Sequence, residues 1–194
     1  RRIAGLRDGS GIKPRFITRT FSTFEEDTEN ARSLMMARRY TETFDERKRE
    51  GKGLYLVGDV GCGKTHLATA IALELLERGV QVVFTTALDM LSEIKRTYNN
   101  DSRFTEHDAM RVYREAELLV LDDLGKEPPT DWAVSNLFSL INDRYENMRP
   151  TVITTQYSDE ELTRRFAKNG DPQTAKAIVS RLHEVCYRIE CAGR

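Results

Sequence analysis

The sequence has 194 residues, with 30 Lys and Arg against 31 Asp and Glu and a net charge of −1. This length suits one domain with a substantial core, and 39% hydrophobic residues combined with a small net charge exclude extensive disorder. No apolar run approaches the roughly 20 residues of a membrane span, so we expect a cytoplasmic protein without a membrane partner. Because the three cysteines are scattered, we expect neither a disulfide framework nor a zinc cluster.

Residues 1–24 are predicted to form an irregular lead-in, because glycine, serine and proline recur between positions 5 and 14. Phe21 and Phe24 interrupt this polar stretch and are expected to pack on the body of the protein. The folded domain is predicted to span residues 25–194. It begins with a surface helix over 25–49, whose apolar stripe repeats every three or four residues: Ala31, Leu34, Ala37, Tyr40 and Phe44.

The rest of the sequence alternates between strand and helix patterns. Strands are predicted over 53–57, 80–84, 118–122, 150–155 and 187–189. Helices are predicted over 64–78, 87–98, 106–116, 132–148, 159–166 and 173–183. Such alternation implies right-handed crossovers between parallel strands. We therefore predict an α/β fold with a mostly parallel five-stranded sheet and helices on both faces.

A glycine-rich phosphate-binding pattern lies between the first predicted strand and the helix that follows it. The run from Gly58 to Thr65 matches G-x-x-x-x-G-K-[ST], whose glycines let backbone N–H groups point at phosphate oxygens. Lys64 is expected to contact the β- and γ-phosphates, and the Thr65 hydroxyl to bind Mg²⁺. An ordinary glycine-rich turn does not explain the strand, helix and lysine together. We predict that ATP or ADP and Mg²⁺ are bound by Gly58, Gly61, Cys62, Gly63, Lys64, Thr65 and His66.

Two acids follow the apolar strand over 118–122, at the sheet edge where parallel α/β proteins bind ligands. Asp122 is expected to hold Mg²⁺, and Asp123 to orient or deprotonate the attacking water. Asp123 stands where glutamate is commoner, which leaves open how fast water is activated. Gln156 follows the fourth predicted strand and can contact the γ-phosphate or the water, although a simple strand-terminal turn is the alternative.

Further segments make the match more specific than a phosphate-binding loop alone. They are Trp132, the Asn-Asp-Arg-Tyr run ending at Tyr145, Arg149-Pro-Thr151 and Ser180-Arg181-Leu182. With these, the sequence resembles the ATPase domain of DnaC-like helicase loaders, in the initiator branch of the AAA+ family. The resemblance implies an AAA+ P-loop fold over residues 25–194. It also implies that Gln156 occupies the sensor 1 position, where asparagine is usual, and that Arg181 is an arginine finger acting on a neighbouring subunit.

The resemblance also implies contact with DNA. Initiator-type AAA+ proteins carry an extra helix after the second strand, and DnaC-like loaders use that region for single-stranded DNA. Lys95 and Arg96 could contact phosphates and Tyr98 could stack on a base, with Arg103 and Arg111 close by. A solvated helix face explains the same residues equally well, because acidic side chains are interspersed with them.

The predicted function is that of a helicase loader, an ATPase that binds single-stranded DNA and delivers a replicative DNA helicase. Hydrolysis is expected to be slow and to depend on an ATP-dependent homo-oligomer, because the finger serves a neighbour. The separate helicase-binding domain of such loaders is expected to be absent from this sequence. The main alternative is an IstB-type transposition helper ATPase that binds duplex DNA. A nucleotide-dependent binding module without hydrolysis also stays open, whereas Arg181 and the paired acids argue against a small-molecule kinase.

Overall fold

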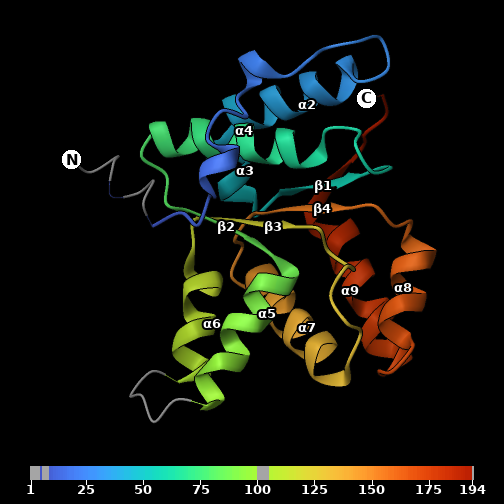
Figure 1. Cartoon of the computed structure of the whole chain (residues 1–194). Coiled ribbons are helices and arrows are strands. Elements are labelled where there is room, and N and C mark those ends of the chain that lie inside the picture. Colours follow the sequence, from blue (N-terminus) through green and yellow to red (C-terminus); the bar gives the residue numbers. More distant parts are fainter. Residues whose placement is uncertain (1–4, 6–8, 100–104, 194) are drawn as a thin grey trace.

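The computed structural model describes residues 5, 9–99 and 105–193 and contains one five-stranded sheet (Figure 1). The strand order is β2-β3-β4-β1-β5, and every neighbouring pair is parallel. The strands are β1 Gly53–Val57, β2 Val82–Thr86, β3 Leu118–Asp122, β4 Thr151–Thr155 and β5 Cys186–Glu190. This arrangement confirms the predicted α/β fold, and β5 is an edge strand as expected.

Helices cover both faces of the sheet, as Figure 1 shows. One face carries α2 Ala31–Glu42, α3 Phe44–Glu50 and α4 Lys64–Glu77. The other carries α5 Ala87–Arg96, α6 Glu106–Glu115, α7 Asp131–Glu146, α8 Asp159–Ala167 and α9 Pro172–Val185. Within the described ranges, none of these helices is long and apolar enough to cross a membrane.

Successive strand residues point to opposite faces, so the sheet separates two hydrophobic clusters. In β1, Leu54 and Leu56 belong to the cluster beneath α2 and α4, whereas Tyr55 and Val57 belong to the cluster beneath α5 to α9. All five residues of β1, β3 and β4 are buried. Burial on both faces explains why β1 and the first four residues of β3 are continuous apolar runs and not alternating patterns.

The prediction of one helix over residues 25–49 is wrong at its start and in its middle. The Asp27 carboxylate accepts hydrogen bonds from the N–H groups of Glu29 and Asn30, each at 2.8 Å, and this turn delays the helix to Ala31. At Thr43 the hydroxyl donates to the Arg39 carbonyl, at 2.9 Å, and a new helix begins. A hydroxyl that bonds its own backbone competes with the helical pattern in this way.

The second strand lies two residues later than predicted. Gly79 ends α4 with a φ of 83°, and its N–H donates to the Leu76 carbonyl. The N–H of Val80 donates to the Leu75 carbonyl, so both groups close the helix and cannot join the sheet ladder. The strand therefore extends to Thr86, whose hydroxyl accepts from the Asp89 N–H and caps α5.

The described part of the lead-in packs along the body of the protein. It contains two short 3₁₀ turns, η1 Pro14–Phe16 and η2 Phe21–Thr23. A third 3₁₀ turn, η3 Thr97–Asn99, lies elsewhere in the fold, directly after α5. Phe21 is buried as expected, and the Arg38 guanidinium lies 5.3 Å from the centre of its ring. This contact places the lead-in next to α2, and the hydrogen bond between the His66 ring and the Thr20 carbonyl places it next to the start of α4.

Candidate nucleotide-binding site

The loop between β1 and α4 has the backbone geometry that its glycines predict. Gly61 and Gly63 adopt φ angles of 91° and 90°, which other residues adopt only with strain. A Cβ added to Gly63 would lie 2.8 Å from the Phe24 ring, so the lead-in packs directly against the loop. The first turn of α4 begins at Lys64, which directs helix N–H groups toward the loop.

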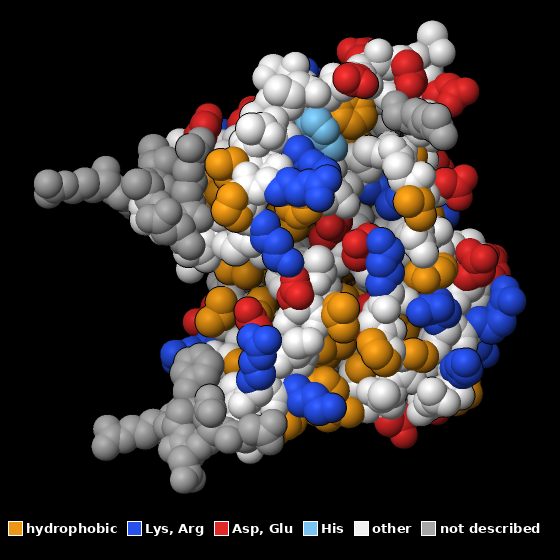
Figure 2. All heavy atoms as spheres, in the orientation of Figure 1, with side chains coloured by type: hydrophobic (Ala, Val, Ile, Leu, Met, Phe, Trp, Pro, Cys, Tyr) orange, Lys and Arg blue, Asp and Glu red, His pale blue; other side chains and the backbone are white. Residues whose placement is uncertain are grey.

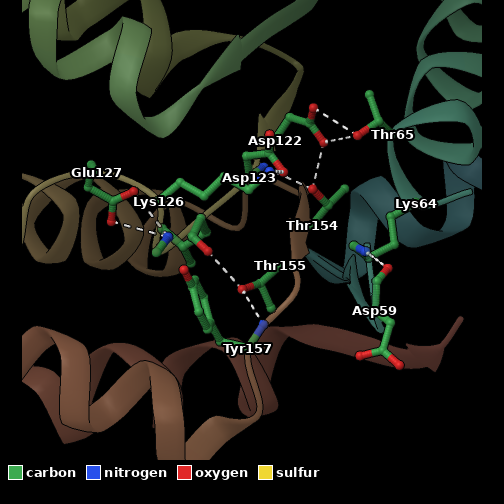
Figure 3. A network of polar contacts seen from close by, with 12 residues as sticks. Asp59, Lys64, Thr65, Asp122, Asp123, Lys126, Glu127, Thr154, Thr155 and Tyr157 are labelled. Atoms are coloured by element: carbon green, nitrogen blue, oxygen red, sulfur yellow. Dashed lines mark hydrogen bonds and ion pairs between the residues drawn. The ribbon is translucent and has the colours of Figure 1, made fainter. Parts of the chain in front are cut away.

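The Lys64 ammonium lies inside this loop and is almost fully buried. Its Nζ donates to the carbonyl oxygen of Gly58 at 2.7 Å and to that of Asp59 at 2.6 Å, and Figure 3 shows the second contact. It also lies 3.5 Å from the Cys62 sulfur. Backbone carbonyls are weak partners for a buried cation compared with an anion. A phosphate group at the loop is therefore a better partner for this ammonium than the carbonyls that now hold it.

Asp122 lies at the end of β3 and faces the start of α4 (Figure 3). The Thr65 hydroxyl lies 3.0 and 3.1 Å from its two carboxylate oxygens, and the Thr154 hydroxyl donates to one of them at 2.6 Å. Burial raises the pKa of Asp122, and the two hydroxyl bonds oppose this shift. A hydroxyl and a carboxylate brought together from distant elements form an oxygen donor set that fits Mg²⁺.

Asp123 has an unusual backbone and a half-buried side chain. Its φ is 59°, and its N–H donates to the Thr154 hydroxyl at 2.9 Å. Its carboxylate pairs with Lys126 at 2.8 Å. The turn is braced by the buried carboxylate of Glu127, which accepts from the N–H of Gly125. The Asp123 carboxylate is close enough to Asp122 that its charge helps to raise the pKa of Asp122.

A cavity of about 360 Å³ brings most of the predicted residues together. Its lining includes residues from the loop, from α4, from the end of β3 and from the end of β4: Gly61, Gly63, Lys64, Thr65, His66, Asp123 and Gln156. A larger cavity, of about 500 Å³, lies between the lead-in, β2, α5 and α6 and contains none of these residues. The smaller cavity, where the charged groups converge, is the candidate site.

Two cations of this cavity were missed by the sequence analysis. Arg19 belongs to the lead-in and packs on the Phe16 ring, and Lys126 follows the acid pair. The sequence signal for Lys126 was its position three residues after Asp123, but no pattern marked Arg19. His66 does more than line the cavity, because its ring contacts the Thr20 carbonyl at 2.8 Å and the Phe24 ring edge to face. It thereby holds the lead-in against the loop.

Arg181 is not part of the lining of this cavity. It projects from α9, lies 4.1 Å from the centre of the Tyr145 ring and pairs with Glu184 at 3.0 Å. The Tyr145 hydroxyl donates to the same Glu184 carboxylate at 2.6 Å. The structure thus separates Arg181 from the nucleotide residues of its own chain.

The predicted DNA-contact residues lie at the end of α5 and in η3. Tyr98 is 53% exposed, but its hydroxyl donates to Glu106 and accepts from the Trp132 indole N–H at 3.0 Å. The Tyr98 and Trp132 rings meet edge to face, which adds Trp132 to this surface. Lys95 and Arg96 are exposed, whereas Arg103 lies outside the described residues. Basic and acidic side chains are interspersed on the face that Figure 2 shows.

Comparison with known proteins agrees with this geometry. The family described as "IstB-like ATP binding protein" matches residues 23–194. The replicative helicase loader DnaC of Escherichia coli strain K12 is 31% identical over 156 residues, which cover 80% of this chain and 62% of that protein. The chain thus spans less than two thirds of the length of this curated relative.

Two solved structures share the fold over almost the whole chain. The crystal structure of the DnaC helicase loader has a TM-score of 0.76 and 27% identity, over 93% of this chain and all of that one. The crystal structure of DnaI has a TM-score of 0.80 and 25% identity, over 94% of this chain and 95% of that one. The chain therefore belongs to the IstB-like ATP-binding protein family and has the AAA+ P-loop fold of the DnaC-type helicase loaders.

Proposed function

We propose that this chain is the ATPase part of a helicase loader, which binds ATP with Mg²⁺, grips single-stranded DNA and helps to deliver a replicative helicase. The observation that carries the nucleotide proposal is the contact between Thr65 and Asp122, 3.0 Å apart at the mouth of a loop that holds Lys64. The similarity to DnaC, named as a replicative helicase loader, supports the biological role.

In this proposal, each residue of the cavity has its own role toward a bound triphosphate. Loop N–H groups and Lys64 bind the phosphates, and Lys64 then exchanges the carbonyls of the loop for phosphate oxygens. Thr65 and Asp122 hold Mg²⁺, which neutralises charge on the phosphates when it is bound. Asp123 orients the attacking water, and Gln156 contacts the water or the γ-phosphate from the end of β4.

Assembly completes the site in this proposal. Arg181 lies outside the cavity of its own chain, held by Tyr145 and Glu184 in a position from which it can serve a neighbour. A guanidinium supplied by a neighbouring subunit stabilises charge that develops during phosphoryl transfer. Hydrolysis is then slow in an isolated chain and faster in the ATP-bound oligomer, so ATP acts as an assembly switch.

The second candidate function is that of a transposition helper ATPase. The family description favours it, because IstB-like proteins share the same ATPase architecture. The two candidates differ in their DNA, because the helper would prefer duplex and the loader single strands. The exposed Tyr98 and the neighbouring Trp132 favour the loader, since aromatic rings stack on unpaired bases.

The nucleotide proposal is tested by calorimetric titration of ATP and ADP, with and without Mg²⁺. Lys64→Ala should abolish measurable binding, because it removes the only lysine that the loop encloses among the described residues. Lys168→Ala removes the same charge from an exposed position outside the cavity and should bind like the wild type. Thermal unfolding of both variants controls for folding, and unchanged affinity in a folded Lys64→Ala protein contradicts the assignment.

A further inference from the structure

Two cysteines lie beside Gly58, at the start of the phosphate-binding loop. Cys62 lies within the loop, and Cys191 directly follows β5. The Cys191 N–H donates to the Val57 carbonyl at 2.7 Å, which brings this segment alongside the start of the loop. A Cβ added to Gly58 would lie 2.9 Å from the Cys62 sulfur and 2.1 Å from the Cys191 carbonyl oxygen. The two cysteines thus flank the same glycine, in the same buried cluster.

The surroundings of the two thiols differ in a chemically useful way. The neighbouring Cys191 thiol and the Lys64 ammonium, whose Nζ lies 3.5 Å from the Cys62 sulfur, lower the pKa of the Cys62 thiol, although burial opposes the shift. The neighbouring Cys62 and burial raise the pKa of Cys191, whose thiol contacts the Ile189 carbonyl. An ammonium beside a sulfur favours its thiolate, which makes Cys62 the nucleophile of the pair and Cys191 the resolving cysteine.

Burial alone would make both cysteines ordinary core residues. The third cysteine, Cys186, shows that case: burial raises its pKa to about 12, and its thiol contacts the Thr151 carbonyl. Cys62 differs because the Lys64 ammonium lies 3.5 Å from its sulfur and because Cys191 lies on the other side of Gly58. It also lies in a surface loop, where Val60 is 79% exposed, so a small movement of the loop admits a small oxidant.

We propose that Cys62 and Cys191 form an oxidative modification site, which takes hydroperoxides and closes the phosphate-binding loop through a disulfide. The Cys62 thiolate attacks the peroxide, the O–O bond breaks, and an S–O bond forms; the departing oxygen takes a proton and leaves as water when the oxidant is hydrogen peroxide. The Cys191 thiol then attacks the sulfenic sulfur. The S–S bond forms, the S–O bond breaks, and a second water leaves with the thiol proton. A dithiol reverses the reaction and is itself oxidised to a disulfide.

The disulfide changes the loop because a sulfur–sulfur bond is only about 2.05 Å long. Cys62 lies between Gly61 and Gly63, so drawing it toward Cys191 moves the N–H groups on both sides. Lys64 also loses the thiolate beside it. This consequence rests on the proposed nucleotide function. We expect oxidation to weaken ADP binding by about tenfold or more, since binding groups work only when held within about 0.5 Å of their required positions.

The sequence makes the test direct, because trypsin cleaves after Lys52, Lys64, Arg181 and Arg188 and leaves each cysteine on its own peptide. Nucleotide-free protein is treated with hydrogen peroxide, free thiols are then alkylated in denaturant, and the peptides are mapped without reduction. Wild type and the matched control Cys186→Ser should link peptide 53–64 to peptide 189–194. Cys191→Ser should form no link, and dimedone should label its Cys62.

Nucleotide affinity is measured by calorimetry on the same samples. Oxidised wild type and oxidised Cys186→Ser should lose ADP affinity by about tenfold and regain it with dithiothreitol. The proposal is overturned by a link through Cys186, by the absence of the predicted link, or by full ADP affinity in the linked protein. Failure of the reduced wild type to bind ADP instead refutes the proposed function, and the peptide map still tests the thiol pair.

Discussion

Arg144 is a buried cation whose role the structure explains, and it provides the sharpest stability prediction. It is 1% exposed, and its guanidinium makes five hydrogen bonds. Their acceptors lie at the end of α6 and the start of β4: the carbonyls of Tyr113, Arg114, Ala116 and Pro150, at 2.6 to 3.0 Å, and the Thr151 hydroxyl, at 2.8 Å. Arg144 thus caps the carboxyl end of α6, where helix carbonyls have no partners within the helix.

Arg144→Met fills part of the same volume but provides no donors. If two of the buried carbonyls go unpaired at about 1–3 kcal/mol each, the free energy of unfolding falls by about 4 kcal/mol. Arg144→Lys should lose about half of this, because an ammonium has three donors and not a planar fork of five. Arg149→Met is the matched control: Arg149 is half-buried and donates to the Arg114 carbonyl at 2.6 Å, so its loss should cost about 1 kcal/mol.

The assay is urea unfolding, followed by circular dichroism and by the fluorescence of Trp132, the single tryptophan. Both probes should give the same midpoint for each protein if unfolding is two-state. The explanation of Arg144 is refuted if Arg144→Met is no less stable than Arg149→Met at equal slopes.

Three further predictions concern the site. Asp122→Asn should raise the melting temperature of the nucleotide-free protein at neutral pH and remove its stabilisation by Mg²⁺ and ATP. Burial raises the pKa of Asp122 in the folded protein, so its charge destabilises the fold at neutral pH. This destabilisation should vanish as the pH falls below 3.8, the pKa of an unperturbed aspartate. Asp123→Ala and Arg181→Ala should each abolish ATP hydrolysis. If each site uses Arg181 of a neighbouring subunit, an equal mixture of the two variants should recover about a quarter of the wild-type rate. No recovery in the mixture argues against that model. Lys95→Ala should reduce the slope of log affinity for single-stranded DNA against log salt concentration by about 0.7. Tyr98→Ala should weaken binding without changing this slope. An unchanged slope in Lys95→Ala places the DNA elsewhere.

Local patterns were sufficient to predict the parts of the site that follow one another along the chain. The glycine spacing before Lys64 and the apolar strand before Asp122 each carry their own signal, and the parallel sheet brings the two ends together. The geometry confirms that Thr65 and Asp122 meet. Their roles toward nucleotide and metal stay predictions.

Features that depend on contacts between distant segments could not be predicted in the same way. The Asn-Asp-Arg-Tyr run was recognised as a family feature, but nothing local showed that Arg144 caps a helix about thirty residues earlier. Nor did any pattern relate Cys62 to Cys191, because only the register of β5 on β1 brings them together. Arg19 reaches the cavity from a lead-in whose path depends on packing against the loop.

In the proposed function, ATP controls the binding of single-stranded DNA. The most direct measurement is fluorescence anisotropy of labelled single-stranded and duplex DNA with ATP, ADP or no nucleotide, on the wild type and on Lys64→Ala. We expect ATP to strengthen binding to the single strand over the duplex, and Lys64→Ala to lose this effect. A preference for duplex supports the transposition helper instead, and equal binding in all nucleotide states contradicts the proposed switch.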